Sequence, residues 1–115
     1  MTAATQSDVP LAELTAEEEA EFTAMNAVAF DLLRVESQEK GTNPPTWLCL
    51  SAETRQEYRA RVLTFLAGKL DLPLNRVESA VNAFVRPEMI EVWKHAERHY
   101  KYLRDVEKNP RAFFT

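Results

Sequence analysis

Hydrophobic residues recur every three or four positions along most of this chain, which is the spacing of an α-helix with one face buried. No stretch of useful length alternates hydrophobic and polar residues as a β-strand does. The prolines separate the periodic segments, because proline interrupts helices or begins them; they are Pro10, Pro44, Pro45, Pro73, Pro87 and Pro110. We therefore predict an all-α fold, a compact bundle of about four helices around one core.

The first helix is expected to begin after Thr15, because Thr15 and Glu18 have the spacing of a capping box. Glutamates fill the first turn, where they complement the positive end of the helix dipole. Val28, Phe30 and Val35 extend the hydrophobic surface well beyond one face of this helix, whose main stripe consists of Phe22, Met25, Ala29, Leu32 and Leu33. Such a helix is expected to lie at the centre of the fold or at a contact with a second subunit, so the chain should form at least a dimer.

Residues 41–46, with one glycine and two prolines, are predicted to form a loop. Ser51 can cap a second helix that runs to about Leu70. Its inward residues are expected to be Tyr58, Val62, Phe65 and Leu66.

A third helix is predicted with Asn75 as its N-cap and Glu78 at its third position. Its inward residues should be Val77, Val81 and Phe84. Pro87 is suited to the first turn of a fourth helix, and the pair Asn109-Pro110 ends it. On this fourth helix we expect an apolar seam that packs against the core or another helix. The seam consists of Met89, Trp93, Ala96, Tyr100 and Leu103.

The chain is divided by these signals into an N-terminal arm (1–14), a single helical domain (15–109) and an aromatic tail (110–115). The tail ends on Phe113 and Phe114, which would be unfavourable if both were exposed to water. We expect the two phenylalanines to fold back onto the core or to insert into another protein.

Net charge is distributed unevenly along the 115 residues. Residues 1–50 carry nine acidic and two basic side chains, whereas residues 51–115 carry nine acidic and twelve basic side chains, and the total is −4. Two complementary faces of one fold explain this asymmetry best. Cys49 is the only cysteine, so no intramolecular disulfide can form.

Several functional classes are disfavoured by the sequence. The N-terminus has no secretion-signal pattern and no segment is apolar for about 18 residues, so we expect a cytoplasmic protein, of a cell or an infected host, that does not bind membranes. Glu91, His95 and His99 are spaced four apart but come from one helix, so we predict no metal site. No catalytic motif, cofactor or small-molecule substrate is indicated, and we expect a protein that is not an enzyme.

The segment AGKLDLPLNRVESAVN (67–82) resembles the helix-turn-helix of bacterial repressors in its spacing of small and apolar residues. Ala67 stands where that motif has a small residue, and Asp71 stands where it usually has glycine. The resemblance implies a helix-turn-helix-like corner between the second and third helices, and DNA binding by the exposed side of residues 75–82. The candidate DNA-binding residues are Asn75, Arg76, Ser79 and Arg86.

The acidic composition and the single cation on this helix weigh against DNA binding. The leading hypothesis is therefore a small interaction protein, of a kind suited to a phage or mobile element, that docks onto a partner protein or onto itself. Aromatic residues are typical anchors of such contacts, and the candidates are Phe30, Trp47, Phe113 and Phe114.

Overall fold

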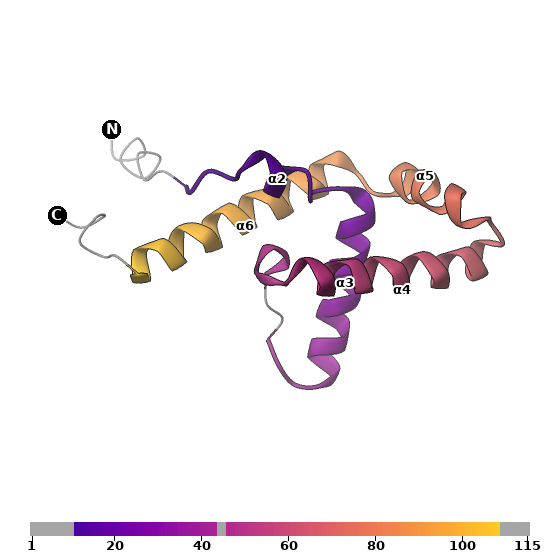
Figure 1. Ribbon diagram of the computed structural model, residues 1–115, viewed down its shortest axis with the longest axis horizontal. Helices are drawn as coiled ribbons and strands as arrows, with labels where there is room; N and C mark the ends of the chain where they lie inside the picture. The colour runs from indigo at the N-terminus through magenta and orange to yellow at the C-terminus, as the bar shows by residue number, and fades with distance from the viewer. Residues whose placement is uncertain (1–10, 44–45, 109–115) are drawn as a thin grey trace.

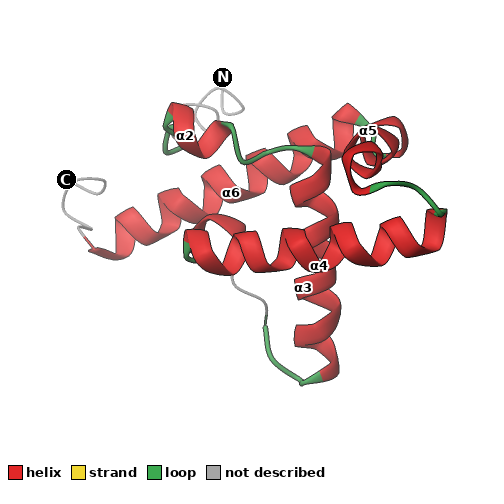
Figure 2. Cartoon of the chain, turned by 45° about the vertical axis from the view of Figure 1, so that its right-hand side comes forward, coloured by secondary structure: helices red, strands yellow, loops and turns green. Residues whose placement is uncertain are grey.

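The computed structural model describes residues 11–43 and 46–108, and the ordered elements among them are all helical (Figures 1 and 2). The aromatic tail 110–115 and most of the N-terminal arm lie outside the described residues. The helices, with one short 3₁₀ helix, are α2 (Ala16–Glu19), α3 (Ala24–Glu39), η1 (Trp47–Cys49), α4 (Ala52–Leu70), α5 (Leu74–Phe84) and α6 (Pro87–Lys108). The predicted all-α bundle is confirmed.

The predicted first helix is wrong in one respect, because it is divided into α2 and α3. The capping box at Thr15 and Glu18 forms as expected, but α2 ends after one turn. The hydroxyl of Thr23 then accepts a hydrogen bond from the backbone N–H of Asn26 and caps a new helix. Phe22, in the intervening turn, is buried edge-on against Trp93, which favours the break.

A short connector of three residues, 71–73, joins α4 to α5, and the predicted helix-turn-helix-like corner is not confirmed. Ser51 caps α4, which ends at Leu70, and Asp71 follows in the left-handed region with φ 55°. Aspartate tolerates this conformation better than most residues do. The predicted N-cap at Asn75 is wrong: Pro73 occupies that position and no side chain caps α5. Proline lacks an N–H and its fixed φ suits a helix start, so α5 begins earlier than expected.

The core lies where α3, α4 and α5 meet η1. Ala29, Trp47 and Val77 are completely buried, and Val62 and Val81 are nearly so. Trp93 of α6 joins this core through its ring, which stacks on Phe30 with 5.5 Å between centroids and meets Trp47 edge-on at 6.3 Å. Val62, Val77 and Val81 are buried as predicted, whereas Phe65 and Phe84 are exposed. The prediction that these two phenylalanines face inward is wrong, because no element among the described residues covers their sides of α4 and α5.

Helix α6 runs roughly along the long axis of the molecule, whose principal dimensions are 56 × 30 × 25 Å, and α5 lies beyond its N-terminal end (Figure 1). Its predicted apolar seam is largely exposed, with Met89 at 62% and Leu103 at 47%. The buried face of α6 contains Glu97 instead, whose carboxylate accepts hydrogen bonds from the backbone N–H groups of Trp47 and Leu48. Ring packing at Trp93 and this carboxylate therefore orient α6, and the other four residues of the seam are exposed.

Ion pairs join the acidic N-terminal half to the basic C-terminal half, as the charge asymmetry predicted. Glu21 lies 3.3 Å from Arg59, and Glu18 accepts a hydrogen bond from Lys101 at 2.9 Å. Lys101 also donates to the backbone carbonyl of Glu13, which holds the described part of the N-terminal arm against α6. The acidic and basic halves of the chain therefore pair with each other within one fold.

Candidate functional site: an apolar surface around α3

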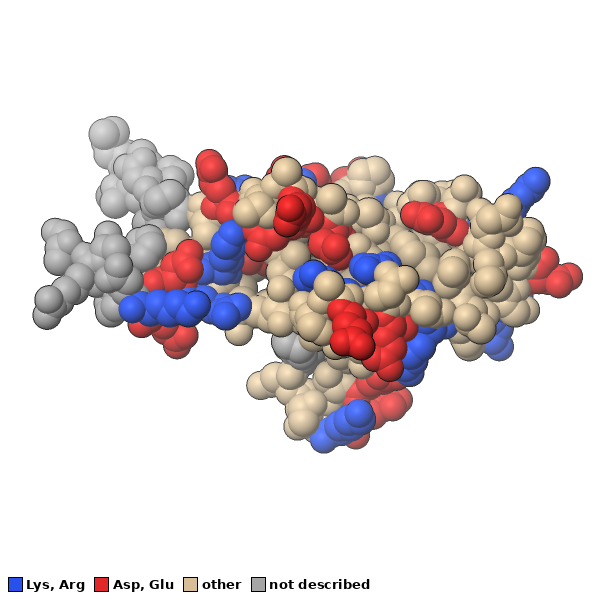
Figure 3. Space-filling view, in the orientation of Figure 1, with Lys and Arg blue, Asp and Glu red and all other residues tan. Residues whose placement is uncertain are grey.

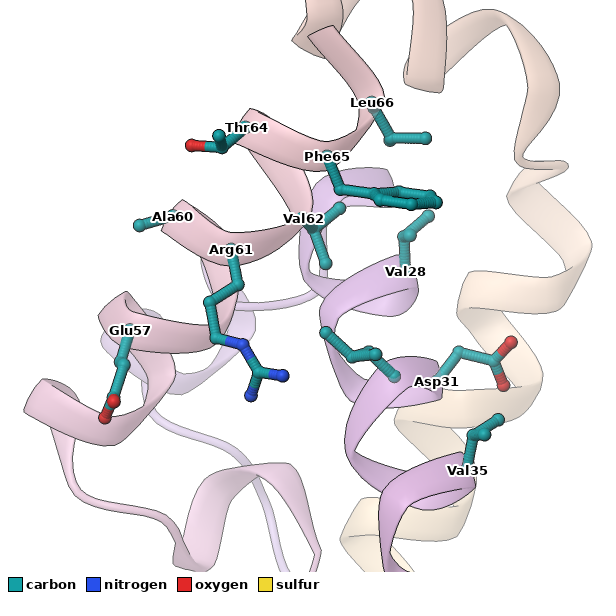
Figure 4. A pocket seen from close by; sticks show the side chains of 11 residues that line it. Val28, Asp31, Val35, Glu57, Ala60, Arg61, Val62, Thr64, Phe65 and Leu66 are labelled. Atoms are coloured by element: carbon teal, nitrogen blue, oxygen red, sulfur yellow. The ribbon is translucent and has the colours of Figure 1, made fainter. Parts of the chain in front are cut away.

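An open apolar groove runs between α3 and α4. It encloses about 860 Å³. Figure 4 shows Phe65 of α4 extending toward Val28 of α3, with Val35 farther along α3. Phe65 is 60% exposed and Val35 47% exposed, so these apolar side chains are uncovered. The other apolar groups that line the groove are Leu32, Ala60, Val62 and Leu66.

A second apolar groove, of about 690 Å³, lies on the other side of α3, against α6. Met89 and Val92 of α6 are 62% and 71% exposed there, and Phe30 is half-buried at its base. Val28 and Asp31 line both grooves. Helix α3 is therefore a ridge between two apolar grooves, and we call the ridge and both grooves the α3 face.

One ion pair lies on the ridge of the α3 face. Asp31 and Arg34 are 3.5 Å apart, one helical turn from each other, and their side chains are 70% and 52% exposed. The other charged residues that line the grooves, Glu57, Arg61 and Glu88, come from α4 and α6. The α3 face is thus apolar with an acid and a base near its middle.

Helices α3 and α4 are fastened together beside this face by Glu36, Arg61 and Tyr58. Arg61 donates hydrogen bonds to the Glu36 carboxylate, and the Tyr58 hydroxyl donates another at 3.0 Å. The hydrogen bond from Arg61 is the largest reason why the pKa of Glu36 is lowered. Burial, followed by the Glu36 carboxylate, raises the pKa of Tyr58. These charge-assisted hydrogen bonds hold α3 and α4 together next to Arg61, which lines the groove.

The predicted partner-binding residues are distributed between the surface and the core. Phe30 contributes to the α3 face. Trp47 is completely buried and its indole N–H donates to Glu21, so it has no surface to offer a partner in this fold. Phe113 and Phe114 lie outside the described residues.

Sequence reasoning missed Phe65, Met89 and Val92 as surface residues. For Met89 and Val92 a signal was present, since they extend the apolar side of the fourth helix beyond what one neighbour covers. No such signal marked Phe65 as a surface residue, because its spacing from Val62 and Leu66 is that of a core residue.

The candidate DNA-binding residues are exposed. Asn75, Arg76 and Ser79 lie on the outer side of α5, and Arg86 precedes α6. Glu78 is exposed on the same helix. Figure 3 shows acidic and basic side chains interspersed across the face in view. That face shows no extended basic patch.

The described residues contain no group of three histidine, cysteine or acidic side chains placed to hold a metal ion. None of their helices is both long and apolar enough to cross a membrane. Comparison of the chain with protein-family models, with curated proteins and with solved structures gives no match.

Proposed function

We propose that this chain is a non-enzymatic interaction protein that works, in the cytoplasm, by docking the α3 face onto another protein surface. The observation that carries the proposal is the pair of apolar grooves on either side of α3. Isolated exposed apolar residues are common on proteins, but adjoining apolar grooves with exposed phenylalanine, methionine and valine side chains are typical of binding surfaces. An accessory protein of a phage or mobile element would fit this role.

The shape of the α3 face suits a helix as the bound element. A groove between two helices accepts an amphipathic helix through apolar residues spaced three and four apart. Phe65 and Met89 stand on opposite sides of the α3 ridge and would act as the anchors, since both are large, exposed and flanked by apolar neighbours. The half-buried Phe30 supports the second groove from below.

A site-specific crosslink tests this proposal directly. Phe65 is replaced by photo-crosslinking benzoylphenylalanine, and Tyr100, an exposed aromatic residue outside both grooves, is replaced in a matched control. Irradiation in the source cell should give one adduct of defined mass from position 65 and none from position 100. Equal adducts from both positions, or none from position 65, would contradict docking through the α3 face.

DNA binding by the exposed side of α5 is the second candidate. It is supported by the exposure of Asn75, Arg76, Ser79 and Arg86 and by the short connector before α5. It ranks lower because Arg76 is the single basic residue within α5, whereas DNA-binding helices neutralise several phosphates.

A further inference from the structure

The α3 ridge carries an acid followed by a base, and this order is complementary to that of a second α3 helix running in the opposite direction. Asp31 precedes Arg34 by three residues, and both side chains are more than half exposed. We propose that a second copy of this chain occupies the α3 face, with the two α3 helices antiparallel about a two-fold axis that passes between Leu32 and Leu33. This inference rests on the proposed function and names its partner.

The two-fold axis determines which residues meet. In an antiparallel pair, positions equally distant from the axis lie opposite each other, so Asp31 of each copy faces the partner's Arg34. Two intermolecular ion pairs then form at the centre of the contact. The same register places Val35, 47% exposed, against the partner's Phe30, beside the groove that contains Met89.

Charge complementarity favours a second copy over an unrelated apolar helix. An apolar helix laid on the ridge would desolvate Asp31 and Arg34 and offer them no new partners, which is unfavourable. An antiparallel copy provides one base for each acid and one acid for each base. In the free chain Asp31 and Arg34 pair with each other at 3.5 Å, and the antiparallel copy places a second opposite charge beside each of them.

Charge reversal on the purified chain of residues 1–115 tests the register. Asp31→Arg gives two bases on the ridge and Arg34→Asp gives two acids, so each variant alone places like charges opposite each other. Mixed together, the two variants place opposite charges in register and should form a heterodimer. Wild type should be a dimer at about 50 µM by light scattering, each variant alone should dissociate with a Kd raised about tenfold or more, and the mixture should recover the wild-type mass.

Native mass spectrometry identifies the recovered dimer, which should contain one copy of each variant. A mixture that stays monomeric, or either single variant that dimerises as tightly as wild type, would overturn the antiparallel register. Both charges are exposed, so circular dichroism melting should be nearly unchanged and loss of the dimer cannot be attributed to unfolding.

A second pair of variants locates the contact independently of charge pairing. Val35→Asp places a charge on the α3 face, and Leu103→Asp places the same charge on the far part of α6 at equal exposure, 47% in each case. The dimer should be lost in the first variant and kept in the second. The opposite pattern would place the dimer contact on α6 and overturn the proposal.

The failures of the two proposals are distinguishable. A wild-type chain that is monomeric at about 50 µM overturns self-association. Docking through the α3 face would still stand if position 65 crosslinks to a protein of another mass. If the wild-type chain is a dimer but position 65 gives no adduct, both proposals are overturned.

Discussion

The carboxylate of Glu97 on α6 accepts a hydrogen bond from the backbone N–H of Trp47, 3.0 Å away and fifty positions earlier in the chain. Glu97 is only 4% exposed and Trp47 is completely buried. A second hydrogen bond, from the Leu48 N–H at 3.2 Å, completes the cap of η1. The start of this 3₁₀ helix is thus satisfied by a side chain from another helix, and the same contact positions α6 beside the α3 face.

Replacing Glu97 by alanine should destabilise the fold by about 2 kcal/mol or more, because a buried N–H group and a partly buried one lose their acceptor. Urea denaturation monitored by circular dichroism measures the loss. The matched control is Glu91→Ala on the same helix, whose side chain is 70% exposed and whose removal should change stability by less than about 0.5 kcal/mol. Equal effects at the two positions would show that the cap contributes nothing.

Glu97 should also make stability depend on pH. Burial raises the pKa of its carboxyl above the ordinary value of 4.5, and the N–H groups of Leu48 and Trp47 oppose this shift only in part. Because the folded chain holds the proton more tightly than the unfolded chain, the stability that Glu97 contributes is complete below pH 4.5 and falls as the pH rises through the raised pKa.

Glu97→Gln cannot ionise, so it isolates this effect. The unfolding free energy of wild type minus that of the variant should decrease from about pH 4 to about pH 8, as measured by urea titrations at each pH. A difference that stays constant or increases with pH would be incompatible with a raised pKa at Glu97.

Trp47 should behave as a core residue. Trp47→Ala should cost about 3–5 kcal/mol through the cavity it leaves. Trp47→Phe keeps most of the ring but loses the hydrogen bond to Glu21, so it should cost about 1–3 kcal/mol. Thermal melting of the two variants against wild type checks both values, and a stable alanine variant would place Trp47 outside the core.

Asp71 should tolerate glycine but not a β-branched residue. At φ 55° a β-branched side chain is strained, and Asp71→Val should cost about 1–2 kcal/mol. Asp71→Gly, the control at the same position, should change stability by less than about 1 kcal/mol, since relief of strain and added chain entropy oppose each other. Denaturant unfolding that finds both variants equal would argue against a left-handed residue in this connector.

DNA binding can be tested separately. We expect no sequence-specific gel shift on genomic fragments at low salt, where phosphate contacts are strongest. If a shift occurs, Arg76→Ala combined with Ser79→Ala should remove it at unchanged melting temperature, since both side chains are exposed. That result would replace docking by DNA binding as the function of the chain.

Local sequence signals predicted the helices well where the cause lay within a few residues. The caps at Thr15 and Ser51, the end of α4 at Leu70 and the start of α6 at Pro87 were all predictable. Each depends on a hydrogen bond or a backbone restriction among near neighbours. The division between α2 and α3 escaped prediction, because it depends in part on Phe22 packing against the distant Trp93.

The candidate site was predictable only in part. Its breadth was indicated by the extra apolar residues of the first helix, Val28, Phe30 and Val35, and these line the α3 face. Phe65 was expected inside, and Met89 was expected against the core or another helix. Periodicity shows which residues share a side of a helix but not whether another helix covers that side.

The sequence by itself determined the all-α class, most helix boundaries and the pairing of an acidic half with a basic half. Hydrophobic periodicity and helix caps depend on residues close in the chain, and net charge is a sum over each half. Only the tertiary structure decided that Trp47 is core, that Phe65 and Met89 are surface, and that Glu97 caps η1 from α6. Those outcomes depend on how helices far apart in the chain are rotated about their axes. Rotation is set by the summed packing of many side chains, which no single segment encodes.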